Sequence, residues 1–163
     1  VIKVTAETCP HYYSVTDEII RGYDTNTKVN PPIREEIDKQ AILEGLRDGT
    51  IDCIVTDHAP HHEDDKNVEY NLAAFGISGI ETSFGFAIKY LYETGVLTLN
   101  EIADKMSYNP AQILGLEGGE IKEGGGLSTL RRRIEREGGS MLVQARPEFR
   151  LTVTIPKDKE GVL

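Results

Sequence analysis

The groups that could do chemistry are concentrated in one short string, Thr56-Asp57-His58-Ala59-Pro60-His61-His62, which holds three of the four histidines of the chain. An apolar stretch at residues 51–56 leads into this string and is predicted to be a buried strand. In parallel α/β folds, catalytic residues gather at the carboxyl ends of strands. A carboxylate such as Asp57 can bind Zn²⁺ and accept a proton from metal-bound water, and a nearby histidine can hold an anionic substrate. The pattern therefore favours a metal-assisted hydrolase.

Two other interpretations of the string stay open on the residues alone. It fits a solvated acidic loop that happens to contain histidines, because histidines clustered after a strand only suggest function. It could also form a self-contained zinc site from Asp57, His58, His61 and His62. That second arrangement is disfavoured, because neighbouring residues on an extended strand point to opposite faces.

The surrounding sequence predicts strands that alternate with helices, which favours an α/β fold with parallel strands. Besides residues 51–56, a buried strand is expected at residues 1–6, and a possible short strand at residues 28–32 ends in two prolines. Helices are predicted at residues 35–47, 83–92, 98–108 and 109–116. Gly49 is expected to end the first of them, Thr98 to open the third with a capping box, and Asn109 to cap the fourth.

Composition narrows the class of protein. The 163 residues suit one ordinary soluble domain but are short for a complete (β/α)₈ barrel, which typically has about 250 residues. A formal net charge of −9 argues against nucleic-acid binding, which relies on Lys and Arg to neutralise phosphates. Cys9 and Cys53 lack paired spacing, and no stretch reads as a signal peptide or a membrane span. We therefore expect a cytoplasmic protein whose chain is truncated at its N-terminus.

Glycines mark a boundary near residue 124. We expect residues 1–124 to form one part and residues 125–163 a second part of different origin. In the second part, a helix is predicted at residues 127–137. Strands at residues 140–145 and 149–155 are then predicted to form a hairpin around Arg146-Pro147-Glu148.

Six strings in one order, spread over about 105 residues, closely resemble the C-terminal portion of dihydroorotases of the amidohydrolase superfamily. They are Ala6-Glu7-Thr8-Cys9-Pro10-His11, Lys28-Val29-Asn30-Pro31-Pro32-Ile33-Arg34, Asp48-Gly49-Thr50-Ile51-Asp52, Thr56-Asp57-His58-Ala59-Pro60-His61, Phe75-Gly76-Ile77-Ser78-Gly79-Ile80-Glu81-Thr82 and Asn109-Pro110-Ala111. The resemblance implies the C-terminal part of a TIM-type (β/α)₈ metallo-hydrolase barrel. It also implies the reversible ring closure of N-carbamoyl-aspartate to dihydroorotate in de novo pyrimidine biosynthesis.

The resemblance implies a role for each matched position. Asp57 matches the carboxylate that ligates zinc and carries the proton from the attacking hydroxide to the leaving ring nitrogen. His61 matches a residue that binds the substrate carboxylate. Asn30 matches a contact to the pyrimidine ring, and Phe75 and Gly76 match main-chain contacts to that ring. His11, His58 and His62 are expected to be structural or solvated rather than metal ligands.

Other parts of the family pattern are missing from the sequence. No H-x-H pair occurs, so Asp57 is the one member of the family's metal set in this chain, and we expect the chain alone to be inactive. An allantoinase or hydantoinase is a near alternative, which His61 and the Asn30-to-Arg34 string disfavour. A non-catalytic dihydroorotase-like partner of aspartate transcarbamoylase is another alternative. An open half-barrel also favours a homo-oligomer.

Residues 125–163 depart from the dihydroorotase pattern. With the preceding glycines they resemble the last glycine box, helix and hairpin of sensor histidine kinase ATP-binding domains. The resemblance raises a third class of function, a nucleotide-binding fragment of a signalling kinase. The remaining parts of that ATP pocket are absent from the sequence, so we expect a helix and hairpin without ATP binding.

Overall fold

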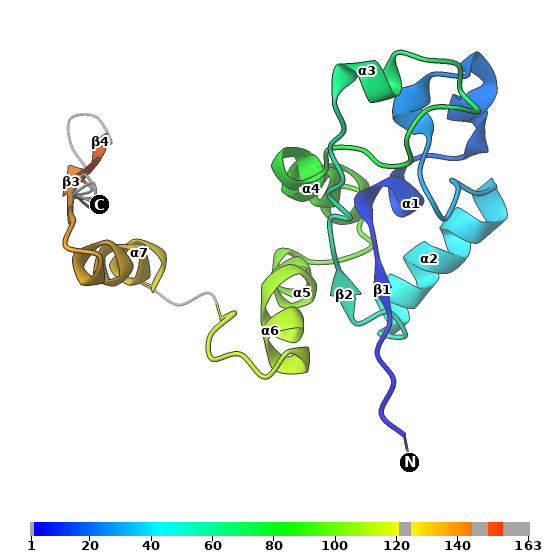
Figure 1. The fold of residues 1–163 in the computed structure, drawn as a ribbon. Helices are drawn as coiled ribbons and strands as arrows, with labels where there is room; N and C mark the ends of the chain where they lie inside the picture. Colours follow the sequence, from blue (N-terminus) through cyan, green and yellow to red (C-terminus); the bar gives the residue numbers. More distant parts are fainter. Residues whose placement is uncertain (1, 121–124, 145–149, 155–163) are drawn as a thin grey trace. The chain divides into compact units, whose positions relative to one another are not determined.

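The structure, a computed structural model, describes residues 2–120, 125–144 and 150–154 (Figure 1). The chain divides into two compact units, Val1–Glu120 and Ile121–Leu163. In the part of the chain that the structure describes, no helix has both the length and the apolar character needed to cross a membrane.

A parallel pair of very short strands organises the first unit. β1 (Glu7–Thr8) lies beside β2 (Cys53–Ile54), with Glu7 opposite Cys53 and Thr8 opposite Ile54 (Figure 1). A separate parallel bridge joins His58 to Ile77. Parallel pairing was expected. β2 is shorter than the predicted strand at residues 51–56, and β1 begins one residue after the predicted strand at residues 1–6 ends.

The predicted strand at residues 1–6 is wrong for the described part of that range. Residues 2–6 have no regular structure, and the side chains of Ile2 and Val4 are 89% and 81% exposed. Pairing begins only at Ala6, whose carbonyl oxygen accepts hydrogen bonds from the backbone N–H groups of Asp52 and Cys53 at 2.9 and 3.2 Å. An apolar β-branched segment becomes a strand only where a partner satisfies its backbone groups.

The segment between β1 and β2 contains four helical elements. They are α1 (Pro10–Ser14), the 3₁₀ turns η1 (Asp17–Gly22) and η2 (Thr25–Thr27), and α2 (Glu36–Asp48). Gly49 ends α2 with a φ of 85°, as its position after the helix predicted. Residues 28–32 form no strand, so the possible strand there is a further correction.

After β2 and the four-residue helix α3 (Glu63–Lys66), two helical stretches follow, each of which contains a π-helical turn. α4 (Ile80–Ala87) continues into η3 (Ile88–Tyr92), and α5 (Leu99–Ala103) continues through η4 (Asp104–Tyr108) into α6 (Asn109–Ile113). The predicted capping box of Thr98 and Glu101 is present. Asn109 is not an N-cap, because its backbone is helical; its side-chain amide instead donates to the carbonyl oxygen of Asp52 at 2.9 Å.

These helices bury one apolar core, called here the helical core. Its members are buried side chains of α1, α2, β2, α4, the π-helical turn η3, the segment after it, and α5: Tyr13, Leu46, Ile54, Ala87, Leu91, Val96, Leu97 and Ile102. Ile54 belongs both to β2 and to this core. The packing of the helices therefore fixes the position of β2, and Asp57 comes three residues after that strand.

The second unit is a helix followed by a hairpin. α7 (Gly125–Arg136) precedes β3 (Ser140–Gln144) and β4 (Arg150–Thr154), which pair antiparallel with Ser140 opposite Thr154. Ile134 and Met141 are its buried apolar side chains among the described residues. The predicted hairpin turn at Arg146-Pro147-Glu148 lies outside the described residues.

Candidate active site at the ends of β1 and β2

β1 and β2 end at the same edge of their small sheet, and residues with chemically reactive side chains follow both strands there. Cys9 and His11 follow β1, and Asp57 follows β2 by three residues. The strands are parallel and in register, so the residues after them emerge side by side. Asp57 has a positive φ of 48°, a left-handed conformation that aspartate tolerates better than most residues.

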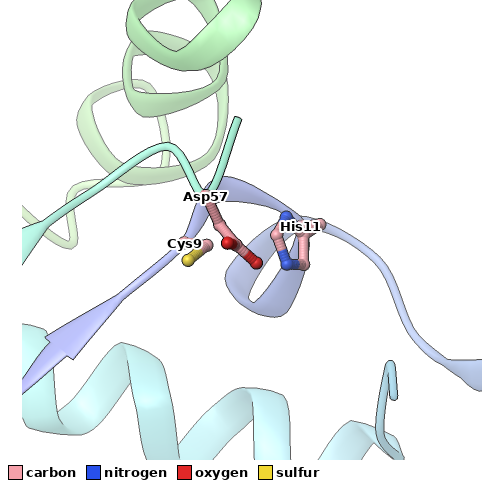
Figure 2. A group of neighbouring side chains, drawn as sticks. All are labelled: Cys9, His11 and Asp57. Carbon is pink, nitrogen blue, oxygen red and sulfur yellow. The ribbon is translucent and has the colours of Figure 1, made fainter. Parts of the chain in front are cut away.

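Cys9, His11 and Asp57 form one cluster at this edge. One ligand-type atom of each residue, the Cys9 sulfur, a His11 ring nitrogen and an Asp57 oxygen, lies within 4.8 Å of the other two. Figure 2 shows the Asp57 carboxylate between the Cys9 sulfur and the His11 ring. Cys9 and His11 are each only 7% exposed, whereas Asp57 is exposed. His11 Nε2 is buried and has no hydrogen-bond partner among the described residues.

Burial controls the protonation of this cluster. Burial, followed by the negative charges of Asp57 and Glu7, raises the pKa of the Cys9 thiol to about 12. Burial lowers the pKa of His11, against an opposing upward effect of the Asp57 carboxylate. At neutral pH the cluster therefore contains a neutral thiol and a neutral imidazole beside Asp57.

The sequence predicted no role for Cys9 and a structural or solvated His11. The predicted roles came from matching positions to a family pattern, in which only Asp57 was a metal ligand. The sequence does contain a pattern that predicts the cluster. Cys9 and His11 come just after the predicted strand at residues 1–6, and Asp57 comes just after the predicted strand at residues 51–56. Because parallel strands end at a common edge, the residues just beyond them are expected to meet.

A second group forms around His61, in the loop at residues 57–77. His61 Nε2 lies 2.7 Å from the carbonyl oxygen of Phe75. A carbonyl oxygen only accepts hydrogen bonds, so Nε2 carries the proton and Nδ1 is the nitrogen left free. Gly76 has a φ of 131°, and a Cβ atom there would lie 2.7 Å from the Ala59 carbonyl oxygen and 3.0 Å from His61 Nε2. Only glycine therefore fits beside His61.

Two lysines bind backbone carbonyl groups of the segment at residues 71–76. Lys28 Nζ donates to the carbonyl oxygens of Asn71 and Ala73 at 3.1 and 2.6 Å. Lys66 Nζ donates to those of Ala74 and Gly76, both at 2.9 Å. Burial and the nearby charge of Lys28 lower the pKa of Lys66. These bonds hold the loop that carries His61 in a defined shape.

Asn30 is connected to this group only through its backbone neighbours. The Gly76 N–H donates to the carbonyl oxygen of Lys28 at 3.0 Å, which brings the chain two residues before Asn30 beside Gly76. The Asn30 side chain is exposed. Its predicted role as a contact to a substrate ring stays a prediction.

The other two histidines of the string support backbone structure. His58 Nδ1 accepts hydrogen bonds from the N–H groups of Gly79 and Ile80, at 3.0 and 3.4 Å, where α4 begins. His62 Nδ1 accepts one from Asp64 at 3.2 Å and caps α3. Neither belongs to the Cys9–His11–Asp57 cluster, so the structure does not assemble the alternative site of Asp57, His58, His61 and His62.

A cleft of about 400 Å³ opens next to the cluster. Its walls come from α1, η2, the residues after β2, the segment before α4, and α4 itself, and they include Pro10, His11, Asn26, Thr56, Ile77, Ser78, Gly79, Thr82 and Phe86. The candidate active site thus combines an exposed carboxylate, a buried imidazole and a cleft that can admit a small molecule.

A model of the amidohydrolase family matches residues 1–125. The chain belongs to the amidohydrolase family. The α/β fold of the first unit is therefore an amidohydrolase fold.

Curated relatives agree with this membership. Dihydroorotase of Endomicrobium trichonymphae is 58% identical over 124 residues, which make up 76% of this chain and 29% of that protein. Dihydroorotase of Ruminiclostridium cellulolyticum is 57% identical over 123 residues, again 76% of this chain and 29% of the relative. The predicted resemblance of residues 1–124 to dihydroorotases is confirmed. The chain spans about 29% of the length of these relatives.

Solved structures show the same fold. The L-hydantoinase (dihydropyrimidinase) of Arthrobacter aurescens matches 74% of this chain and 28% of its own, with a TM-score of 0.68 and 28% identity. The dihydropyrimidinase of Brevibacillus agri NCHU1002 matches 73% of this chain and 28% of its own, with a TM-score of 0.67 and 22% identity. The histidine kinase resemblance of residues 125–163 stays a prediction.

Proposed function

We propose that residues 1–124 are the C-terminal portion of the (β/α)₈ barrel of a dihydroorotase, a cyclic amidohydrolase that interconverts N-carbamoyl-aspartate and dihydroorotate. One observation carries the proposal: dihydroorotases are 58%, 57% and 53% identical to this chain over 123 or 124 residues. The hydantoinase-type structures are only 28% and 22% identical. The difference favours dihydroorotate over hydantoins as the substrate.

A metal is part of the proposal, because the dihydroorotase branch of the amidohydrolase family is generally metal-dependent. Asp57 fits a metal ligand: its carboxylate is exposed at a strand end and has no hydrogen bond or salt bridge among the described residues. Zn²⁺ held there would activate water and polarise the scissile carbonyl group.

Two residues of this chain then transfer the proton and bind the substrate. Asp57 accepts a proton from the attacking water and delivers it to the leaving ring nitrogen. His61 binds the substrate carboxylate through Nδ1, because its Nε2 proton is committed to the Phe75 carbonyl oxygen. Nδ1 needs a proton of its own to donate to that carboxylate.

Asn30 and the main chain of Phe75 and Gly76 contact the pyrimidine ring of the substrate. In the described structure the Gly76 N–H and carbonyl oxygen already bond to Lys28 and Lys66, and the Phe75 carbonyl oxygen bonds to His61. The Phe75 N–H has no such partner among the described residues, and it is the main-chain donor left for a ring carbonyl oxygen.

A chimaeric enzyme tests the proposal. The matching 124-residue segment of the Endomicrobium trichonymphae dihydroorotase is replaced by that of this chain, and hydrolysis of dihydroorotate and of hydantoin is compared. We expect dihydroorotate to be the preferred substrate. Asp57→Asn should lower kcat by about 10²–10⁴-fold, the usual contribution of a positioned acid–base group.

His62→Asn is the matched control for Asp57→Asn. His62 lies in the same loop, is exposed, and only caps α3. Its kcat should stay within about twofold of the unsubstituted chimaera. A folded chimaera that prefers hydantoin, or one that tolerates Asp57→Asn, would contradict the proposal.

A further inference from the structure

We propose that Cys9, His11 and Asp57 together form a metal site of their own, selective for a Zn²⁺-type cation, that this chain can fill without further protein ligands. The site shares Asp57 with the proposed catalytic role but does not depend on that role. It also revises the expectation that this chain offers a single metal ligand, because that expectation counted only ligands of the family pattern.

Geometry is the first argument. The three candidate ligand atoms lie within 4.8 Å of one another. Around a tetrahedral Zn²⁺, with bonds of about 2.0–2.3 Å, ligand atoms are roughly 3.3–3.7 Å apart. Closing the site therefore needs a contraction of about 1 Å. Asp57 can supply it, because its side chain is exposed, whereas Cys9 and His11 are buried at the start of α1.

The second argument is the unsatisfied state of His11. Its Nε2 atom is buried, with no hydrogen-bond partner among the described residues, although the side chain is only 7% exposed. Leaving a buried polar atom without a hydrogen-bond partner is unfavourable, because the atom has lost its contact with water. No hydrogen bond joins Cys9, His11 and Asp57 to one another in the described structure, so the three groups converge without satisfying each other. A cation between them would satisfy all three.

Ligand chemistry selects the cation. A thiolate, an imidazole and a carboxylate are ligands of Zn²⁺ and of its spectroscopic substitute Co²⁺, whereas Mg²⁺ and Ca²⁺ prefer oxygen ligands alone. Binding of the cation would release the Cys9 thiol proton to solvent, and the resulting thiolate and the Asp57 carboxylate would balance the two positive charges. Three protein ligands, one of them facing solvent, leave a fourth position open to water.

Cys53 provides a matched control inside the same chain. It is the other free cysteine, buried to 4% exposure in β2, and it does not belong to the cluster. Any metal effect that depends on a buried thiol in general should appear equally at Cys53. An effect of the proposed site should appear only at Cys9.

The test is titration of the full, metal-stripped chain with Co²⁺, followed by absorption. We expect saturation at a single equivalent, a thiolate-to-cobalt charge-transfer band, and displacement of Co²⁺ by Zn²⁺. Cys9→Ser should abolish the charge-transfer band, and Cys53→Ser should retain it. His11→Gln and Asp57→Asn should each weaken Co²⁺ binding by at least about tenfold, since even the loss of groups behind the ligands costs 10–100-fold.

Asp57→Asn keeps the test decisive if a substitution of a buried residue prevents folding, because Asp57 is exposed. Circular dichroism should show an unchanged helical spectrum for this variant. Absence of Co²⁺ binding to the unsubstituted chain, a charge-transfer band that survives Cys9→Ser, or full affinity in Asp57→Asn would each overturn the proposal. These outcomes are independent of the chimaera assay, so failure of the metal site and failure of the proposed function are distinguishable.

Discussion

Two regions of the first unit, the helical core and the loop at residues 57–77, are held by different forces. The helical core consists of apolar side chains, of which Tyr13 and Leu91 are completely buried. The loop is largely exposed, and ammonium groups of Lys28 and Lys66 bind its backbone carbonyl oxygens. Apolar packing thus positions Asp57 through β2, whereas polar bonds position His61.

The largest expected effect is in the helical core. Leu91→Ala removes a completely buried side chain and should lower the free energy of unfolding by about 2–5 kcal/mol. Urea denaturation followed by circular dichroism measures this loss. Leu114→Ala, at a side chain that is 70% exposed, should change stability by less than about 0.5 kcal/mol. Equal effects of both substitutions would contradict the assignment of the core.

The second-largest loss of stability should come from removing a lysine that binds the loop. Lys28→Met keeps a long apolar side chain but removes the donor to the carbonyl oxygens of Asn71 and Ala73. Hydrogen bonds to charged groups contribute about 1.5–3 kcal/mol, so unfolding in urea should shift by about that amount. Limited proteolysis should also show faster cleavage in residues 57–77.

Lys89→Met is the control for this substitution. Lys89 is exposed on η3 and lies over the Tyr90 ring, without a hydrogen bond to a carbonyl group. Its loss should change the free energy of unfolding by less than about 0.5 kcal/mol and leave cleavage of the loop unchanged. A loop cleaved equally in both variants would show that Lys28 does not hold it.

Gly76→Ala tests the close approach beside His61. Its Cβ would meet the Ala59 backbone at 2.7 Å, and its φ of 131° is strained for any residue with a side chain. Strain of this kind costs of order 1–3 kcal/mol, and the His61–Phe75 bond should be disturbed. Urea denaturation reports the cost, and NMR of the His61 ring reports the bond.

Gly85→Ala is the matched control, because that position lies inside α4 with nothing within 4 Å of its added Cβ. Alanine in a helix interior should stabilise the chain by about 0.5–1 kcal/mol. The two glycine substitutions should therefore have opposite signs. A neutral Gly76→Ala would mean that the loop adapts freely.

The smallest expected effect concerns pH and the capping box of α5. Hydrogen bonds from the Thr98 backbone and side chain lower the pKa of Glu101 from its ordinary value of 4.5. The stability that Glu101 contributes is therefore fully present above pH 4.5 and is lost as pH falls through the lower folded-state pKa. Urea midpoints measured from pH 6 to pH 3 should fall less steeply in Glu101→Gln.

The sequence alone determined the features that depend on local rules. The end of α2 at Gly49 and the capping box of Thr98 follow from residue types at fixed spacings. Motif order over residues 1–124 was enough to indicate the family, because six strings in one order rarely arise by chance. These signals need no knowledge of what lies across the fold.

Tertiary structure decided where pairing starts and which side chains meet. Residues 2–5 have the composition of a strand but no backbone partner among the described residues, whereas pairing begins at Ala6. The side-chain amide of Asn109 bonds to the Asp52 carbonyl oxygen across the fold instead of capping a helix. The convergence of Cys9 and His11 on Asp57 depends on the register of β1 with β2, a contact across more than forty residues. Spacing along the chain sets local conformation, but only packing across the chain sets the distances that make a site.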